Sequence, residues 1–164
     1  MSLTPLPPSQ LANLRWLWIS AAVVVLDQLT KHWVVTSFRP REEWVLTPFL
    51  SFVLAFNPGA AFSFLASADG WQRWLFTAIA VAACALMLWL LYRGGSRLFA
   101  LGLVLIVGGA LGNLWDRVAA GRVTDFLLFH YAGWSWPAFN VADSAITVGA
   151  AMLILDSFRE RNNA

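Results

Sequence analysis

The stretch AIAVAACALMLWLLY, residues 78–92, contains no charged side chain and no Ser, Thr, Asn, Gln, Gly or Pro. With residues 71–77 it forms an apolar segment of about 20 residues, the length that a helix needs to cross the hydrocarbon core of a membrane. Similar segments occupy residues 16–35, 98–115 and 139–158. These four segments predict an all-α polytopic membrane protein, built as a bundle of four transmembrane helices.

The composition agrees with a membrane protein and argues against other classes. Apolar residues make up 59% of the 164 residues and charged residues 12%, whereas soluble domains have roughly 45–50% and about 25%. The 11 Lys and Arg residues form no basic run, which argues against nucleic-acid binding. Two His and one Cys are too few for a protein-only zinc site, so we expect no metal and no cofactor. Cys84, within an apolar run, is expected to be a buried structural thiol.

The connections between the segments set the expected topology. The connection at 93–97 is a short turn, whereas those at 36–70 and 116–138 are long. Four helices joined in this way put both long loops on one side of the membrane, and the short turn and both termini on the other. Each side carries five arginines, but those on the long side are partly offset by acids, and the compact clustering on the short side favours its location in the cytoplasm. The expected arrangement is a cytoplasmic tail, a four-helix membrane domain and a second cytoplasmic tail, at residues 1–15, 16–158 and 159–164.

Both long loops contain apolar residues that indicate local structure. Residues 44–56 are rich in Val, Leu, Phe and Trp and are interrupted by Pro48, a pattern that predicts one or two short strands. Residues 124–131 are apolar and aromatic around one acid. We expect them to form a helix or strand that is half-buried at the membrane interface.

Charged residues inside the apolar segments need a partner, because a charge at the centre of a spanning helix costs roughly 2.5–3.5 kcal/mol. Asp27 and Lys31 are four positions apart and share one helix face, so a mutual ion pair that holds the helix in the bundle would explain them. Asp116 directly follows the third segment, at the C-terminus of the expected helix, where the helix dipole disfavours an acid, and a local salt bridge to Arg117 would offset this. Arg117 could instead bind backbone carbonyls or a lipid phosphate.

Two further acids lie on the side of the long loops. Asn140 and Asp143 have the spacing of a capping box at the start of the fourth helix, and capping alone would explain both. Asp125 lies among apolar residues with no cation within two positions, so burial would raise its pKa. If Asp125 and Asp143 converge, a helix N-terminus stabilises one as an anion while apolar neighbours keep the other neutral. Two-carboxylate enzymes use this asymmetry to activate water.

Five short motifs follow one another in an order that is typical of one enzyme family. They are DQLTK (27–31), NPGAAF (57–62), GNLWDR (112–117), GRVTDF (121–126) and FNVADS (139–144). With these motifs the chain resembles bacterial lipoprotein signal peptidase, also called signal peptidase II, from about residue 16 to residue 158. Each motif alone is weak, whereas five in order with four helices in the right places are highly specific.

The resemblance implies an aspartic endopeptidase of the bacterial inner membrane that needs no metal and removes signal peptides from prolipoproteins. Cleavage would fall immediately before a cysteine that carries a diacylglyceryl group, and the cyclic peptide globomycin would inhibit it. The implied fold adds a small β-rich extracytoplasmic cradle to the helices, and we expect a monomer in contact with membrane lipid. The implied roles are catalysis by Asp125 and Asp143, substrate binding by Asn57, Asn113, Arg117 and Asn140, and structural support by Asp27, Lys31 and Asp116.

Two other classes of protein place carboxylates in membranes. A transporter or channel would use them to bind a proton or cation, but here the acids cluster toward one surface, and no pair of broken helices marks an inverted repeat. A structural subunit would use them only to hold helices together. Replacing each Asp by Asn separates these classes, because an enzyme loses cleavage but stays folded, a transporter loses flux, and a structural subunit loses assembly.

Overall fold

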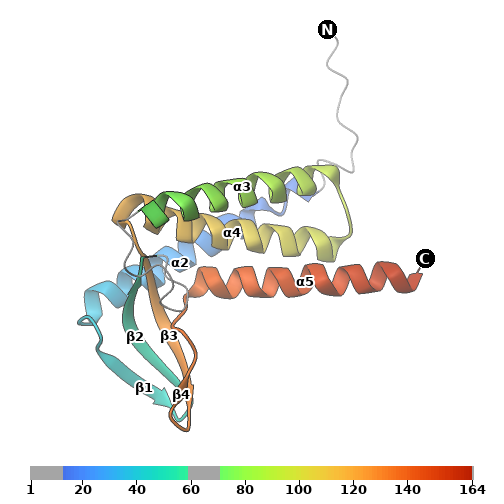
Figure 1. The fold of residues 1–164 in the computed structure, drawn as a ribbon. Coiled ribbons are helices and arrows are strands. Elements are labelled where there is room, and N and C mark those ends of the chain that lie inside the picture. The colour runs from blue at the N-terminus through green and yellow to red at the C-terminus, as the bar shows by residue number, and fades with distance from the viewer. Residues whose placement is uncertain (1–12, 59–70, 164) are drawn as a thin grey trace.

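A computed structural model describes residues 13–58 and 71–163, which form four long helices and a small sheet (Figure 1). The helices are α2 (Leu17–Ser37), α3 (Trp71–Arg93), α4 (Arg97–Ala120) and α5 (Val141–Asn163). The strands are β1 (Glu43–Thr47), β2 (Leu50–Asn57), β3 (Val123–Tyr131) and β4 (Trp134–Ser135). Most of the expected N-terminal tail, and the part of the first long loop and of the NPGAAF motif at 59–70, lie outside the described residues.

The four apolar segments form helices as predicted, but α4 is longer than its apolar segment. It continues past residue 115 to Ala120. Gly121 follows in the left-handed conformation, with φ of 74°, and ends the helix there. Asp116 and Arg117 therefore lie inside α4, and the expectation that Asp116 marks the end of the helix is wrong.

Three helices within the described residues are long and apolar enough to cross a membrane. They are α3, α4 and the Val141–Arg159 part of α5, with mean hydropathies of 2.3, 2.0 and 1.5. Only 11% of the most apolar window of α3 is buried inside the protein, so most of that apolar surface needs lipid around it. The α2 helix is not among the three, so the structure supports three of the four expected spans.

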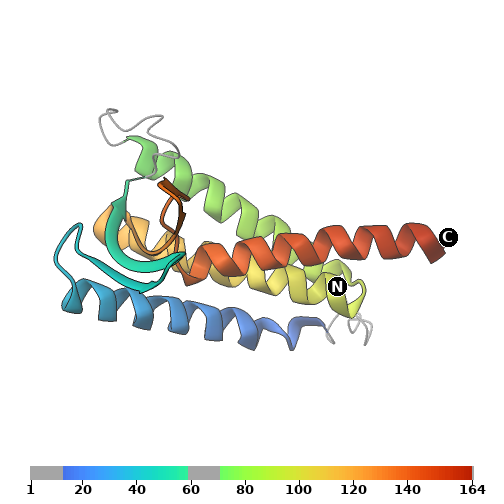
Figure 2. The same cartoon turned by 90° about the horizontal axis from the view of Figure 1, so that it is seen from below.

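Helix α4 is the centre of the bundle and packs against α2, α3 and α5 (Figure 2). Small residues allow this close packing. A methyl group on Gly102 would lie 2.8 Å from the Gly149 carbonyl oxygen, and one on Gly109 would overlap the Ala142 carbonyl oxygen. Because α5 approaches α4 this closely at both points, its N-terminus has a fixed position beside the second half of α4.

The sheet joins the two long loops at one end of the bundle (Figure 1). Its strands are antiparallel in the order β1-β2-β3-β4, with Leu50 opposite Phe129 and Asn57 opposite Val123. This confirms the strands predicted within 44–56, assigns 124–131 to a strand, and confirms that both loops lie on the same side of the bundle. A buried apolar cluster fastens the sheet to α2 and consists of Val34, Phe38, Leu54 and Phe126.

Candidate active site

The residues singled out from the sequence meet where the sheet joins the bundle. Helix α2 carries Asp27 and Lys31, β2 carries Asn57, α4 carries Asn113, Asp116 and Arg117, β3 carries Asp125, and the start of α5 carries Asn140 and Asp143. Five elements that are distant in sequence therefore contribute to one polar region inside an otherwise apolar protein.

The first turn of α5 is held by a reciprocal capping box. The Asp143 backbone N–H donates to Asn140 Oδ1 at 2.8 Å, and the Asn140 backbone N–H donates to Asp143 Oδ2 at 3.2 Å. These bonds satisfy N–H groups that a helix N-terminus otherwise leaves unpaired. The capping interpretation is confirmed, but both side chains also have partners outside the helix.

The side chain of Asn140 connects the two candidate catalytic acids. Its Oδ1 accepts the Asp143 N–H, and its Nδ2 donates to Asp125 Oδ1 at 2.7 Å. The same Nδ2 lies 3.2 Å from the Thr124 backbone oxygen. Asn140 is fully buried. One amide group without access to water therefore holds Asp125, on β3, against the start of α5.

A second amide, that of Asn113, positions Asp143 from α4. Asn113 Nδ2 donates to Asp143 Oδ1 at 2.7 Å, while its Oδ1 accepts from Lys31 Nζ at 3.0 Å and from Asn140 Nδ2 at 3.1 Å. Because a lysine ammonium can only donate, its contact with Oδ1 decides which end of the amide faces Asp143. Lys31 therefore orients Asn113, and Asn113 orients Asp143.

Lys31 lies between two carboxylates in the protein interior. Its Nζ is 2.7 Å from Asp27 Oδ2 and 3.0 Å from Asp116 Oδ2. The expected Asp27–Lys31 pair is confirmed. The expected salt bridge between Asp116 and Arg117 is wrong, because successive residues of a helix point about 100° apart and only Asp116 faces α2. We name the three residues Asp27, Lys31 and Asp116 the lysine cluster.

The lysine cluster also fastens the two segments that carry the candidate catalytic acids. Asp116 Oδ2 accepts from the Thr124 backbone N–H at 3.1 Å, and Asp27 Oδ1 accepts from the Ala142 backbone N–H at 2.9 Å. Each of these N–H groups belongs to the residue directly before a candidate acid. The cluster therefore fixes the backbone beside both acids.

Gln28 belongs to the same network and was not singled out from the sequence. Its Nε2 lies 2.9 Å from Asp116 Oδ1 and 3.2 Å from both Asp27 Oδ2 and the Gly112 backbone oxygen. An amide side chain next to a charged pair within an apolar segment was the signal that could have identified it.

The carboxyl group of Asp125 is almost completely buried, with 3% of the residue exposed. This burial, together with the nearby charge of Asp143, raises its pKa to about 7. Hydrogen bonds with Asn57 and Asn140 and the charge of Lys31 act in the opposite direction. The direction is the one that its apolar neighbours predict. At neutral pH this group can therefore hold or release a proton.

An apolar groove of about 610 Å³ lies beside Asp143. Its walls are Phe129 of β3, residues 136–139 and the first turns of α5 as far as Val148, and the lining is mostly aromatic and aliphatic. Grooves of this kind bind apolar chains and use a few polar groups to orient them. Asp143 is the charged residue of the lining.

Arg117 places a cation near the two acids. Its Nη1 lies 3.4 Å from the Asn113 backbone oxygen, and its guanidinium lies 5.5 Å from the centre of the Phe76 ring. The charges of Asp143 and Asp125 both attract it. Its side-chain N–H groups are suited to bind the carbonyl oxygens of a peptide.

Among the described residues, no three His, Cys, Asp or Glu side chains are placed so that they could hold one metal ion. Cys84 is a buried free thiol within α3. The described site contains carboxyl, amide, ammonium and guanidinium groups.

Comparison with known proteins covers the whole of this site. The family described as signal peptidase (SPase) II matches residues 19–159. The chain belongs to this family. The lipoprotein signal peptidase of Pseudoalteromonas atlantica is 48% identical over 154 residues, 93% of this chain and 94% of that protein. The lipoprotein signal peptidase of Burkholderia mallei is 54% identical over 150 residues, 91% of this chain and 90% of that protein. That of Paraburkholderia phymatum is 49% identical over 165 residues, 100% of this chain and 99% of that protein.

Solved structures agree with membership of the signal peptidase II family. The structure of a bacterial membrane enzyme superimposes with a TM-score of 0.79 at 28% identity and covers 89% of this chain and 88% of that one. A second such structure has a TM-score of 0.75 at 29% identity and covers 84% and 88%. The resemblance carried by the five motifs is confirmed, and the chain is a membrane-embedded protease of a bacterial type.

Proposed function

We propose that this signal peptidase II is an aspartic endopeptidase that removes the signal peptide from diacylglyceryl-modified prolipoproteins immediately before the lipidated cysteine. Asp125 and Asp143 are the proposed catalytic pair. The observation that supports this most directly is the buried amide of Asn140, which contacts both residues. The relatives named lipoprotein signal peptidase support the class of substrate.

The two aspartates suit opposite roles in peptide hydrolysis. Asp143 accepts hydrogen bonds from the Asn113 side chain and the Asn140 backbone, and it acts as the carboxylate that takes a proton from the attacking water. Asp125, with its raised pKa, gives its proton to the carbonyl oxygen as the tetrahedral intermediate forms. When the C–N bond breaks, Asp143 returns its proton to the cysteine nitrogen, and a hydroxyl of the intermediate returns a proton to Asp125.

The substrate-binding residues divide into two groups in this proposal. Asn113 and Asn140 are occupied by protein partners on both sides of their amides, so they bind substrate chiefly by orienting the two acids. Arg117 and Asn57 lie beside the pair and contact the peptide backbone around the scissile bond. The apolar groove next to Asp143 receives an apolar part of the substrate, either a side chain of the signal peptide or an acyl chain.

We also propose that α2 is a fourth span, with both termini in the cytoplasm and the active site toward the outer face of the inner membrane. The charges of α2 are paired inside the protein, and the surface that it exposes includes Val25, Leu26 and Leu29. The two ends carry equal numbers of arginines, but those at the end opposite the sheet lie close to the helix ends in compact groups, which favours a cytoplasmic location. The enzyme is a monomer in this proposal, needs no metal and is inhibited by globomycin.

Cleavage of a purified, lipid-modified prolipoprotein by the purified chain, followed by gel shift, tests the activity. Asp125→Asn and Asp143→Asn should each lose about 10³-fold, within the 10²–10⁴-fold range of general acid–base groups. Asp156→Asn is the matched control, because it removes a buried carboxylate at the far end of the same helix, α5. Near-normal turnover of folded Asp125→Asn would refute the proposed pair.

Three further measurements test the finer claims. Globomycin should block cleavage, an unmodified prolipoprotein should be processed far more slowly than the lipidated one, and excess EDTA should have no effect. Loss of activity in EDTA that zinc restores would contradict the aspartic mechanism. Reporter fusions after Arg97 and Ala164 should be cytoplasmic, and a periplasmic C-terminus would overturn the topology.

A further inference from the structure

A second groove, far from the proposed peptidase site, lies at the opposite end of the bundle. Its volume is about 310 Å³, and Leu98, Leu155, Phe158 and Arg159 line it. It therefore lies between the first turn of α4 and the last turns of α5. Leu155 and Phe158 are more than half exposed, at 56% and 57%. Apolar walls and a cation are combined here on the outer surface of the protein.

This groove lies at the level where two apolar spans end. Helix α4 begins at Arg97, directly before Leu98, and the apolar part of α5 ends at Arg159. Arginines at the ends of spans lie among lipid headgroups, while the apolar residues beside them face acyl chains. Helix α5 also continues past the turn between α3 and α4 (Figure 1), and beyond that turn no helix of the described residues lies beside it.

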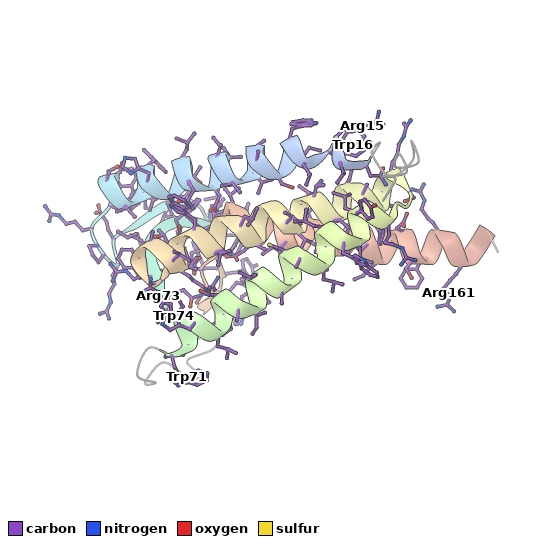
Figure 3. The ribbon with its side chains drawn as sticks, turned by 90° about the horizontal axis from the view of Figure 1, so that it is seen from above. Arg15, Trp16, Trp71, Arg73, Trp74 and Arg161 are labelled. Atoms are coloured by element: carbon purple, nitrogen blue, oxygen red, sulfur yellow. The ribbon has the colours of Figure 1, made fainter. Side chains whose placement is uncertain are left out.

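The end of the bundle that carries this groove is positively charged. Figure 3 shows Arg15 and Arg161 at this end, with Arg73 at the other. Exposed arginines also close the turn between α3 and α4 and the end of the α5 span, at Arg93, Arg97 and Arg159. Among the residues whose side chains the structure describes, Asp156 is the acid of this end; it is buried, and its Oδ1 accepts a hydrogen bond from the Ser96 hydroxyl at 2.5 Å. Among the described side chains at this end of the bundle, cations therefore outnumber anions.

We propose that this groove binds one anionic phospholipid, with an acyl chain against Leu155 and Phe158 and the phosphate beside Arg159. A free anion would be attracted by the arginine but would make no favourable contact with the apolar walls. A zwitterionic lipid would be attracted less strongly by the surrounding arginines. An arginine near an anionic membrane surface contributes about 1 kcal/mol, which is roughly fivefold in affinity. Such binding does not depend on peptidase activity, because Asp143 lies at the other end of α5.

Equilibrium binding of a fluorescent phosphatidylglycerol to the delipidated full chain in detergent tests this site. Phosphatidylcholine with the same acyl chains is the comparison, at constant ionic strength. We expect phosphatidylglycerol to bind at least fivefold more tightly, and Arg159→Gln to remove most of that preference. Arg41→Gln is the matched control, since it removes the same charge from an exposed position at the sheet end. Leu155→Trp, which fills the groove from a half-exposed position, should weaken both lipids.

Each result either supports or overturns the site. Equal affinities for the two lipids would overturn it. So would equal losses in Arg159→Gln and Arg41→Gln, because the preference would then come from the overall charge of the protein. If millimolar inorganic phosphate displaced the lipid, Arg159 would be part of a site for free anions, and the lipid site would be overturned. A Leu155→Trp variant that stays folded and binds both lipids normally would exclude the groove as the acyl site.

Discussion

Asp125→Asn should stabilise the folded protein at alkaline pH although it abolishes cleavage. The pKa of Asp125 is raised from 3.8 to about 7, chiefly by burial. Between these two values the folded protein keeps a proton that the unfolded chain has released. The free energy of unfolding therefore falls as pH rises from about 4 to about 7, and this loss persists at higher pH. Asparagine has no proton to release and avoids the loss.

The size of this effect follows from the interval between the two pKa values. Between pH 5 and pH 8, about two pH units lie inside this interval, namely those from pH 5 to about pH 7. Each unit lowers the free energy of unfolding by about 1.36 kcal/mol. The advantage of Asp125→Asn should thus grow by roughly 3 kcal/mol between these pH values. In a chain of this size 1 kcal/mol changes the Tm by roughly 2–4 °C, so the Tm difference should increase by roughly 6–12 °C.

Thermal unfolding in detergent at pH 5 and pH 8, followed by tryptophan fluorescence, measures this increase. Comparing one pair of proteins at two pH values cancels any pH-independent change in the hydrogen bond to Asn140. Glu42→Gln is the control, because a hydrogen bond from the Arg39 backbone N–H lowers the pKa of Glu42, the opposite direction to the shift of Asp125. The contribution of Glu42 is complete above about pH 4.5, so its Tm difference should be the same at pH 5 and pH 8. An equal Tm difference for Asp125→Asn at both pH values would refute the buried, protonated carboxyl group.

The same network predicts how pH, the lysine cluster and helix packing affect the enzyme. Cleavage per folded molecule should fall about tenfold per pH unit above pH 7 as Asp125 loses its proton, and a rate that stays constant to pH 9 would contradict its acid role. Lys31→Met should cost roughly 3–5 kcal/mol in thermal unfolding, because it leaves two buried carboxylates without a cation. Asp116→Asn should cost less, because Lys31 keeps its second carboxylate, and the reverse order would contradict the cluster. Gly109→Ala should lower both Tm and cleavage by pushing α5 away from α4, whereas the partly exposed Leu111→Ala, the control, should change cleavage little.

Features with a local cause could be predicted from the sequence. The helices follow from apolar length, and the Asp27–Lys31 pair follows from a spacing of four residues on one helix. The strands of the first long loop follow from their apolar residues and the interruption at Pro48. The end of α4 was misplaced because hydropathy falls at residue 115, whereas the backbone continues until Gly121 permits a left-handed residue.

Features that depend on contacts between distant segments could not be predicted in this way. Asp116 has a cation beside it in sequence, but the helix turns it toward Lys31 of α2. Asn140 has a sufficient local explanation as a helix cap, and nothing in its neighbours indicates that its other amide atom reaches Asp125 on β3. The convergence of the two acids was suggested only by their position on either side of a short connection and by the family resemblance.

In the proposed mechanism, the site contains residues that serve folding and residues that serve catalysis. Lys31 neutralises two buried carboxylates and also orients Asn113, so its loss should reduce stability and activity together. Asp125 contributes a carboxyl group whose ionisation opposes folding, so its replacement should remove activity and increase stability. A residue that weakens the fold persists only where function requires it. Opposite signs of the Tm change in Asp125→Asn and Lys31→Met, measured at pH 8, would therefore distinguish a catalytic acid from a structural charge without any assay of cleavage.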